Sequence, residues 1–439
     1  MLTAERNALI TQSGPGTPLG AFMRQYWQPA ALVDEFDGPR PVRRVRLLGE
    51  DFVLFRDEAG RYGLLDRHCA HRGADLSYGR AEDGGLRCPF HGWLFDTAGA
   101  CLEQPAEPVA SNFCKSVHQP AYPCRVESGI VFAYLGTGAP PALPAFDCFV
   151  APDAYTFAFK GLIECNWLQA LEVGIDPAHA SYLHRFFEDE APEQSYGKQF
   201  RGATMGADMP MTRILREFGR PRIEVETTEY GLRIAALRQL NEREMHIRIT
   251  NMAFPHAFVI PMSQDMTITQ WHVPVDDTHC YWYAIFTSFT NPVDKAVMRE
   301  QRLALYELPD YIPRINKLND YGFDPHEQAT STYTGMGADI DVHDQWAVES
   351  MGPIQDRTKE HLGSSDKAIA AYRRLLVRAI GDVAEGRAPL LTAGAAAQIQ
   401  GPASIDAIGP VADWEAHWRD LDRSRRAASP WNAALSAAA

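Results

Sequence analysis

The stretch from Cys69 to His91 decides how the N-terminal part of this chain folds. It contains two short segments, Cys69-Ala70-His71 and Cys88-Pro89-Phe90-His91, with sixteen residues between them. Each segment offers one thiolate and one imidazole, and a glycine follows each histidine within two residues. Two cysteines and two histidines that are divided evenly between two loops indicate a metal site to which both loops contribute.

A Rieske [2Fe–2S] cluster needs this division of ligands, because one of its irons takes both cysteines and the other takes both histidines. A structural zinc site is the alternative, since two cysteines and two histidines are also a zinc ligand set. Zinc fingers usually pair cysteine with cysteine and histidine with histidine along the sequence, so the mixed order favours the cluster. We therefore predict that Cys69, His71, Cys88 and His91 bind a Rieske cluster, whose reduction potential of roughly −150 to +300 mV suits electron transfer.

Composition excludes several classes of partner. The chain has 439 residues and a formal net charge of −14, which argues against nucleic acid or an anionic membrane surface. No run reaches the ~18 apolar residues of a membrane span, and residues 1–20 lack the pattern of a secretory signal. The eight cysteines have no disulfide-like spacing. These features predict a cytoplasmic protein, and the length predicts two domains.

The apolar pattern divides the chain into four parts. We expect a lead-in over residues 1–40 and an all-β Rieske domain over 41–145, which ends in a Pro/Gly-rich linker. A mixed catalytic domain follows over 146–385. Residues 386–439 form an Ala/Gly/Pro-rich tail that we expect to be peripheral or partly loose. Successive strand-like runs in the third part predict one large antiparallel sheet, and they span 222–228, 232–239, 245–252, 266–275 and 280–288.

A second group of metal-binding residues lies in a predicted helical region over 166–187. Asp176-Pro177 is typical of a helix start, and His179 and His184 follow five residues apart. Five residues correspond to about 140° around an ideal helix, so both histidines reach one metal only if the helix is distorted there, for example by a π-bulge. With one carboxylate they would complete the facial triad of non-haem Fe(II) oxygenases. The alternative is that His179 and His184 bind no metal and lie at a helix interface, with Asp176 as an ordinary helix cap. The predicted electron carrier upstream favours iron.

The third ligand must come from elsewhere in the chain. The densest candidate region is 339–351, which contains Asp339, Asp341 and Asp344. Physical reasoning alone does not choose among these three aspartates.

The chain resembles the catalytic (alpha) subunits of Rieske non-haem iron aromatic ring-hydroxylating oxygenases, in the group typified by phthalate dioxygenase. The resemblance extends from near the start to about residue 380. Its motifs are Cys69-x-His71…Cys88-x2-His91-Gly92-Trp93, Asn166-Trp167…Glu172…Asp176-x2-His179-x4-His184, Glu349-Ser350-Met351-Gly352-Pro353-Ile354-Gln355-Asp356-Arg357-Thr358 and Glu360…Asp366 with Arg373-Arg374. Two positions depart from it: Phe90 stands where tyrosine is common, and Val173 where relatives often have asparagine.

The resemblance implies an α+β fold, with an all-β Rieske domain and a helix-grip (START-like) catalytic domain whose curved antiparallel sheet wraps a long helix. It selects Asp344 as the carboxylate ligand of Fe(II), five residues before Glu349. It also implies a head-to-tail homotrimer or a multiple of it, in which Asp176 links a cluster histidine of one subunit to His179 of the next. The resemblance further implies O₂ as the co-substrate. NADH electrons come through a separate flavin and iron–sulfur reductase, since this chain shows no nicotinamide or flavin fingerprint.

The substrate is less well specified. The resemblance implies cis-dihydroxylation of a phthalate-like aromatic carboxylate, with O-demethylation of an aryl methyl ether acid by monooxygenation as the alternative. In the strand-like run 246–250, His246, Arg248 and Thr250 share one face. If that face lines a cavity, Arg248 is suited to pair a substrate carboxylate, and Arg238 is a second candidate. The alternative for each arginine is a solvated position on the outer face.

Overall fold

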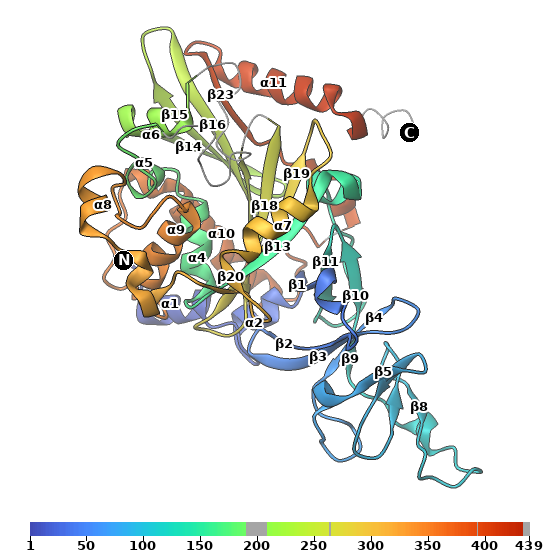
Figure 1. Cartoon of the computed structure of the whole chain (residues 1–439). Helices are drawn as coiled ribbons and strands as arrows, with labels where there is room; N and C mark the ends of the chain where they lie inside the picture. Colours follow the sequence, from blue (N-terminus) through green and yellow to red (C-terminus); the bar gives the residue numbers. More distant parts are fainter. Residues whose placement is uncertain (190–208, 263–264, 393, 433–439) are drawn as a thin grey trace.

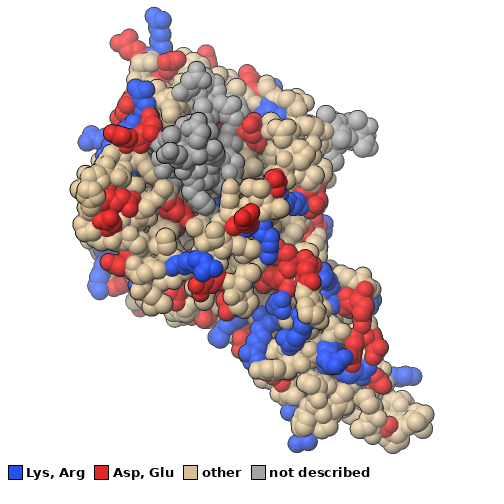
Figure 2. Space-filling model, viewed as in Figure 1, with Lys and Arg blue, Asp and Glu red and all other residues tan. Residues whose placement is uncertain are grey.

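The computed structural model describes residues 1–189, 209–262, 265–392 and 394–432. Figure 1 shows a large domain from which a smaller, elongated group of β-strands projects. Figure 2 shows that acidic and basic side chains are scattered together over the visible face of the large domain. Among the described residues, no helix is long and apolar enough to cross a membrane.

The projecting part, which we call the cluster domain, has two four-stranded sheets. Their strands lie in the orders β2-β3-β4-β9 and β5-β6-β7-β8. Their bounds are β2 Val42–Leu47, β3 Glu50–Arg56, β4 Tyr62–Asp66, β5 Arg80–Glu82, β6 Gly85–Arg87, β7 Leu94–Phe95, β8 Cys101–Glu103 and β9 Ala121–Tyr122. A small hydrophobic core that includes Phe55, Leu65 and Trp93 holds the two sheets together and contains both predicted cysteine ligands.

A third sheet connects the cluster domain to the rest of the molecule. It consists of β1 Trp27–Leu32, β11 Ile130–Tyr134 and β10 Cys124–Glu127, in the order β1-β11-β10. Its buried side chains belong to the core of the large domain, where the rings of Phe132 and Trp271 lie 5.8 Å apart. Because β1 pairs with β11, the strands at this end of the chain begin within residues 1–40, which we expected to be a lead-in.

The large domain is built on an eight-stranded antiparallel sheet. Its order is β13-β19-β18-β17-β16-β15-β14, and β23 pairs with β16. The bounds are β13 Thr156–Ile163, β14 Arg222–Thr228, β15 Gly231–Gln239, β16 Glu244–Ala253, β17 Ala257–Pro261, β18 Met266–Pro274, β19 Cys280–Ser288 and β23 Ile405–Pro410. The predicted α+β class and the predicted antiparallel sheet are confirmed, although β13 and β17 were not among the predicted strands.

Helices pack against this sheet. Helix α4 contacts β17, β18 and β19, and α10 contacts β14 and β15. The helices span α1 Ala4–Thr11, α2 Pro18–Met23, α3 Asp147–Val150, α4 Trp167–Gly174, α5 Ala180–Leu183, α6 Met211–Glu217, α7 Lys295–Leu303, α8 Pro325–Thr330, α9 Ile340–Glu349, α10 Lys367–Ala384 and α11 Trp414–Ala428. The fold also contains two short strand pairs, β12 Ala145–Phe146 with β22 Gln400–Gly401 and β20 Tyr306–Glu307 with β21 Ile312–Pro313.

The C-terminal segment is not peripheral, so that expectation was wrong for its described part. Strand β23 lies beside β16, and α11 packs against the opposite face of the sheet from α4, with Trp418 buried among Ile247 and Ile249 (Figure 1). Trp418 and the apolar alternation of β23 supply enough buried surface to hold the segment despite its Ala/Gly/Pro-rich composition. Residues 393 and 433–439 lie outside the described part of the chain.

Candidate metal centres

The two cysteine–histidine loops have the same backbone geometry. In each loop, the amide of the glycine four residues after the cysteine donates to the cysteine carbonyl, at 2.8 Å for Gly73 and 3.0 Å for Gly92. Both glycines adopt a positive φ, +76° and +73°, which other residues rarely adopt. Each cysteine amide in turn donates to the carbonyl five residues on, at 2.8 Å. The two loops therefore present their side chains as a matched pair.

In these loops the two cysteines lie next to each other, and so do the two histidines. Cys69 and Cys88 are 3% and 2% exposed, and the Cys69 thiol donates a hydrogen bond to the Cys88 sulfur, which lowers the pKa of Cys88 to about 6. The rings of His71 and His91 lie 4.5 Å apart, and Trp93 stacks on His71 at 4.3 Å. Paired sulfurs on the buried side and paired imidazoles beside them fit the donor set of a Rieske cluster.

His179, His184 and Asp344 converge as the resemblance implies. The two Nε2 atoms are 3.3 Å apart, and Oδ1 of Asp344 lies 3.7 Å from Nε2 of His179 and 3.3 Å from Nε2 of His184. Three ligand atoms about 2.1 Å from one metal, at mutual angles near 90–110°, are separated by roughly 3.0–3.5 Å. Among the described residues this is the one group of three such side chains within 4.8 Å of one another.

The carboxylate of this group fits a metal. Its buried Oδ1 has no hydrogen-bond partner of satisfactory geometry among the described residues, which is unusual for a buried oxygen. Burial acts to raise the pKa of Asp344, but His184 and His179 together outweigh it and keep that pKa below its ordinary value. Burial also lowers the pKa of His179, so its imidazole is neutral at pH 7, as a metal ligand must be.

Hydrogen bonds on the far side of each imidazole direct the Nε2 lone pairs inward. Nδ1 of His179 donates to the carbonyl of Asp176. Nδ1 of His184 lies 3.5 Å from Nδ1 of His343, a fully buried residue whose Nε2 donates to Gly337 at 3.0 Å. When Nε2 of His343 donates and its Nδ1 accepts, Nδ1 of His184 is the donor, which leaves Nε2 of His184 free for a metal. Sequence reasoning missed His343, although it directly precedes Asp344.

The local helix differs from the expected one. The expected continuous helix from residue 166 ends at Gly174, and α5 begins only at Ala180, so His179 stands at its start and His184 just past its end. The distortion that brings the two rings together is therefore the shortness of α5 rather than a π-bulge. The carboxylate of Asp176 accepts the amide proton of Ala178 at 2.8 Å, a local turn rather than a cap on α5 itself.

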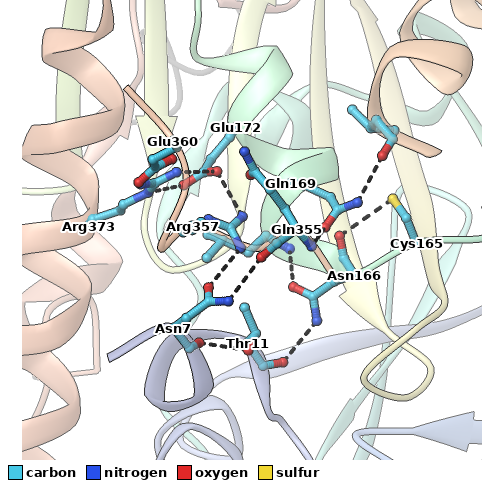
Figure 3. A network of polar contacts seen from close by, with 12 residues as sticks. Asn7, Thr11, Cys165, Asn166, Gln169, Glu172, Gln355, Arg357, Glu360 and Arg373 are labelled. Atoms are coloured by element: carbon cyan, nitrogen blue, oxygen red, sulfur yellow. Dashed lines mark hydrogen bonds and ion pairs between the residues drawn. The ribbon is translucent and has the colours of Figure 1, made fainter. Parts of the chain in front are cut away.

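A buried polar network holds α4, and with it the histidine segment, in place (Figure 3). Glu172 on α4 accepts hydrogen bonds from Arg357 and Arg373 at 2.5–2.9 Å, and Arg373 also pairs with Glu360. Gln169, one turn earlier, donates to the carbonyls of residues 348 and 352 at 2.8 Å, just beyond Asp344 on the α9 side. These contacts fix the spacing between α4 and α9, which lie beside the candidate ligands His179, His184 and Asp344.

Replacing Glu172 with Gln is expected to lower the free energy of unfolding by about 3–5 kcal/mol, because the buried Arg357 would lose its carboxylate partner and Arg373 would retain only Glu360. Burial acts to raise the pKa of Glu172, but the positive charges of Arg357 and Arg373 outweigh this effect. The pKa of Glu172 is therefore below its ordinary value. The stabilisation is therefore complete above the ordinary carboxyl pKa of 4.5 and is lost as pH falls through the lower folded value.

Urea unfolding at pH 7 and at pH 3.5 measures both effects. Glu415→Gln, which removes an exposed partner of Arg419, serves as the matched control and should cost less than about 1 kcal/mol. Equal losses in the two variants would contradict a stabilising role for the buried network.

Comparisons with known proteins agree with this geometry. A family model described as Rieske [2Fe-2S] domain matches residues 26–119, and one described as LigXa C-terminal domain like matches residues 134–437, more than half of the chain. The phthalate 4,5-dioxygenase oxygenase subunit of Pseudomonas putida is 35% identical over 96% of this chain and 94% of its own length. The chain is a Rieske non-haem iron oxygenase.

Other relatives of this Rieske oxygenase have different reactions in their names. The 5,5'-dehydrodivanillate O-demethylase oxygenase subunit of a Sphingobium species is 32% identical over 89% of this chain and 83% of the relative. The solved structure of dicamba monooxygenase bound to dicamba is 20% identical, with a TM-score of 0.56 over 82% of this chain and 98% of that one, and so shares the fold. The enzyme has the cofactors of its family, a Rieske cluster and a mononuclear iron, with O₂ as co-substrate and NADH electrons supplied through a reductase.

The two arginines predicted for substrate lie on the inner face of the sheet. Arg238 on β15 pairs in register with His246 on β16, and both are buried. Arg248, two residues further along β16, already forms an ion pair with Asp406 at 2.5 Å, and Asp406 also accepts from His246 at 2.8 Å. Sequence reasoning missed Asp406, because it lies in the segment expected to be a peripheral tail.

Proposed function

We propose that this Rieske oxygenase is the terminal component of a system that cis-dihydroxylates a phthalate-like aromatic carboxylate. The iron supplies O₂ activation when bound, and the chain's own residues hold the metals and orient the substrate. The proposed ligands are Cys69, His71, Cys88 and His91 for the cluster, and His179, His184 and Asp344 for the iron. The observation that supports the substrate class is a buried arginine without a carboxylate partner.

That arginine is Arg238, which is 2% exposed. One of its nitrogens lies 3.2 Å from the carbonyl of Pro177 and 3.4 Å from Oγ of Ser181, which flank His179, while Nε and Nη1 have no partner among the described residues. Burial and the nearby Arg248 lower its pKa to about 10, so it remains cationic at neutral pH.

The neighbouring charges do not neutralise this cation. Asp406 balances Arg248, and burial lowers the pKa of His246, which is therefore neutral at pH 7. One buried positive charge remains beside the iron-ligand segment, and a buried charge requires a counter-ion. A substrate carboxylate paired with Arg238 would lie beside the segment from Pro177 to Ser181, which contains His179.

O-demethylation of an aryl methyl ether acid is the second candidate, because one relative is named an O-demethylase subunit. Turnover under ¹⁸O₂ with phthalate, benzoate and methoxybenzoate distinguishes the two. Two labelled oxygens in one diol product indicate dihydroxylation, whereas released formaldehyde indicates demethylation. Turnover of the methyl esters as fast as of the acids would contradict the carboxylate proposal.

Arg238→Gln is expected to raise the KM for an aromatic acid by about 10- to 100-fold, since a hydrogen bond to a charged group contributes about 1.5–3 kcal/mol. The KM for the neutral ester of that acid should change little. Arg233→Gln is the matched control, because Arg233 lies on the same strand but on the other face, over Trp418. Steady-state kinetics with the acid and its ester measure the difference; an equal change for both compounds would contradict the pairing.

We also propose head-to-tail assembly of identical subunits, with a trimer or a multiple of it as the unit. Figure 1 shows the cluster domain projecting away from the large domain, at the opposite end from α5 and α9. Electrons that enter the cluster of one chain then reach the iron of a neighbouring chain rather than its own. Asp176, beside His179 and half-buried, is the proposed link between the two metals.

A further inference from the structure

A basic groove lies between β2 of the cluster domain and the adjoining edge of the large domain. Its volume is about 600 Å³. Six cationic side chains line it, against three acidic ones, Glu35, Asp51 and Asp310. The cationic ones are Arg40, Arg43, Arg44, Arg46, Arg67 and Lys160. Figure 2 shows basic side chains gathered over this region of the molecule.

The surplus of positive charge is local, because the whole chain has a net charge of −14. Lys160 is neutralised by Glu35 at 2.7 Å, and Arg67 by Asp75 at 2.6 Å. Arg40 and Arg43, by contrast, donate hydrogen bonds only to backbone carbonyls, and no carboxylate lies within ion-pair distance of either one among the described residues. Their guanidiniums are available to an anionic partner.

The groove adjoins the first cluster loop. Arg67, on its wall, binds Asp75 through Nε and Nη2 and accepts the amide of Leu76 through its carbonyl. Between Arg67 and Leu76 in the sequence, the amide of Cys69 donates to the carbonyl of Ala74. An electron donor bound in the groove would therefore stand against the base of the loop that holds Cys69 and His71.

We propose that this groove is the docking surface for the electron donor, and that the donor presents an acidic face to Arg40, Arg43 and Arg44. The inference rests on the proposed function, which requires a protein that delivers NADH electrons to the cluster. A protein partner fits better than a small anion, because Arg44 and Arg46 are about half exposed, so the basic lining extends to the surface. Both form long ion pairs, Arg44 with Asp75 at 3.4 Å and Arg46 with Asp51 at 3.9 Å. Complementary charge accelerates such encounters by about 10- to 1,000-fold at low salt.

The test is reduction of the Rieske cluster in the holoenzyme by an acidic plant-type [2Fe–2S] ferredoxin, without aromatic substrate. Freeze-quench EPR follows the two clusters separately under anaerobic conditions. Arg40→Gln/Arg43→Gln/Arg44→Gln is expected to slow the second-order rate at least tenfold at low ionic strength. The corresponding triple Lys variant should retain most of the rate, and the wild-type rate should fall as salt increases.

Two controls separate docking from damage to the cluster. Reduction by the methyl viologen radical, a small cation, should be equally fast in the wild type and the Gln variant. A variant that loses three exposed arginines elsewhere, Arg378→Gln/Arg419→Gln/Arg423→Gln, should react with ferredoxin as the wild type does. Because no aromatic substrate takes part, an error in the proposed substrate leaves these results unchanged.

Three outcomes would overturn the proposal. If ferredoxin reduced the Gln variant at the wild-type rate, the arginines would have no role in docking. Their function would then be to protect the edge strand β2 from pairing with another chain. A slow Lys variant would show that charge is not the property that matters. Competitive inhibition by millimolar inorganic phosphate at constant ionic strength, absent in the Gln variant, would assign the groove to a small anion.

Discussion

Asp176→Asn is expected to leave both metals in place and to lower turnover by about 100-fold or more, the upper end of the effects that residues around metal ligands have. Asn retains the side-chain oxygen that accepts the amide of Ala178, so the turn before α5 survives. The backbone carbonyl that orients His179 is also unchanged. Only the negative charge between the two proposed metal centres disappears.

Iron and sulfide analysis, together with product formation coupled to a reductase, measures this prediction. Asp324→Asn is the matched control, because Asp324 also accepts an amide two residues on, at the start of α8, and its variant should be fully active. Normal product formation by Asp176→Asn would contradict the proposed link between subunits.

Asp344→Ala is expected to remove the mononuclear iron and to abolish product formation while the cluster remains. Iron should fall from about three to about two per chain, with the visible spectrum of the cluster unchanged. Two imidazoles alone hold Fe(II) weakly, since the facial triad requires a carboxylate. Loss of the cluster together with the iron would instead point to general unfolding.

Asp339→Asn provides the comparison within the same helix. Asp339 caps α9 by accepting the amide of Asp341 at 3.1 Å, and Asn caps equally well. This variant should retain three irons per chain. Loss of iron from Asp339→Asn would reopen the choice among the aspartates that the sequence left undecided.

Most of the sheet was predictable, because strand formation leaves a local pattern. The five predicted runs correspond to β14, β15, β16, β18 and β19 within two residues at either end. On β16, the apolar residues Met245, Ile247 and Ile249 pack under α11, and the alternate residues face inward. Periodicity of two is visible in the sequence wherever one face is apolar.

The inner polar residues were only partly predictable, because their partners are distant in sequence. The position of Arg248 on one face of its strand made it a substrate candidate. Its partner Asp406 lies 158 positions away, and no residue near Arg248 in the sequence indicates this ion pair. The convergence of Asp344 on His179 and His184 likewise came from a resemblance rather than from spacing. The donors at Cys69 to His91 were visible because both loops lie close together in the chain.

The order in which a ribosome releases this chain has a consequence for β16. Its inward Arg248 is synthesised 158 positions before Asp406 on β23, which follows only near the end of the chain. Until then the guanidinium of Arg248, like that of Arg238, has no carboxylate partner on the inner face of the nascent sheet. The apolar outer face also lacks α11, which covers it in the folded chain. The inner face of the sheet is thus completed last, after the two cysteine–histidine loops have already emerged.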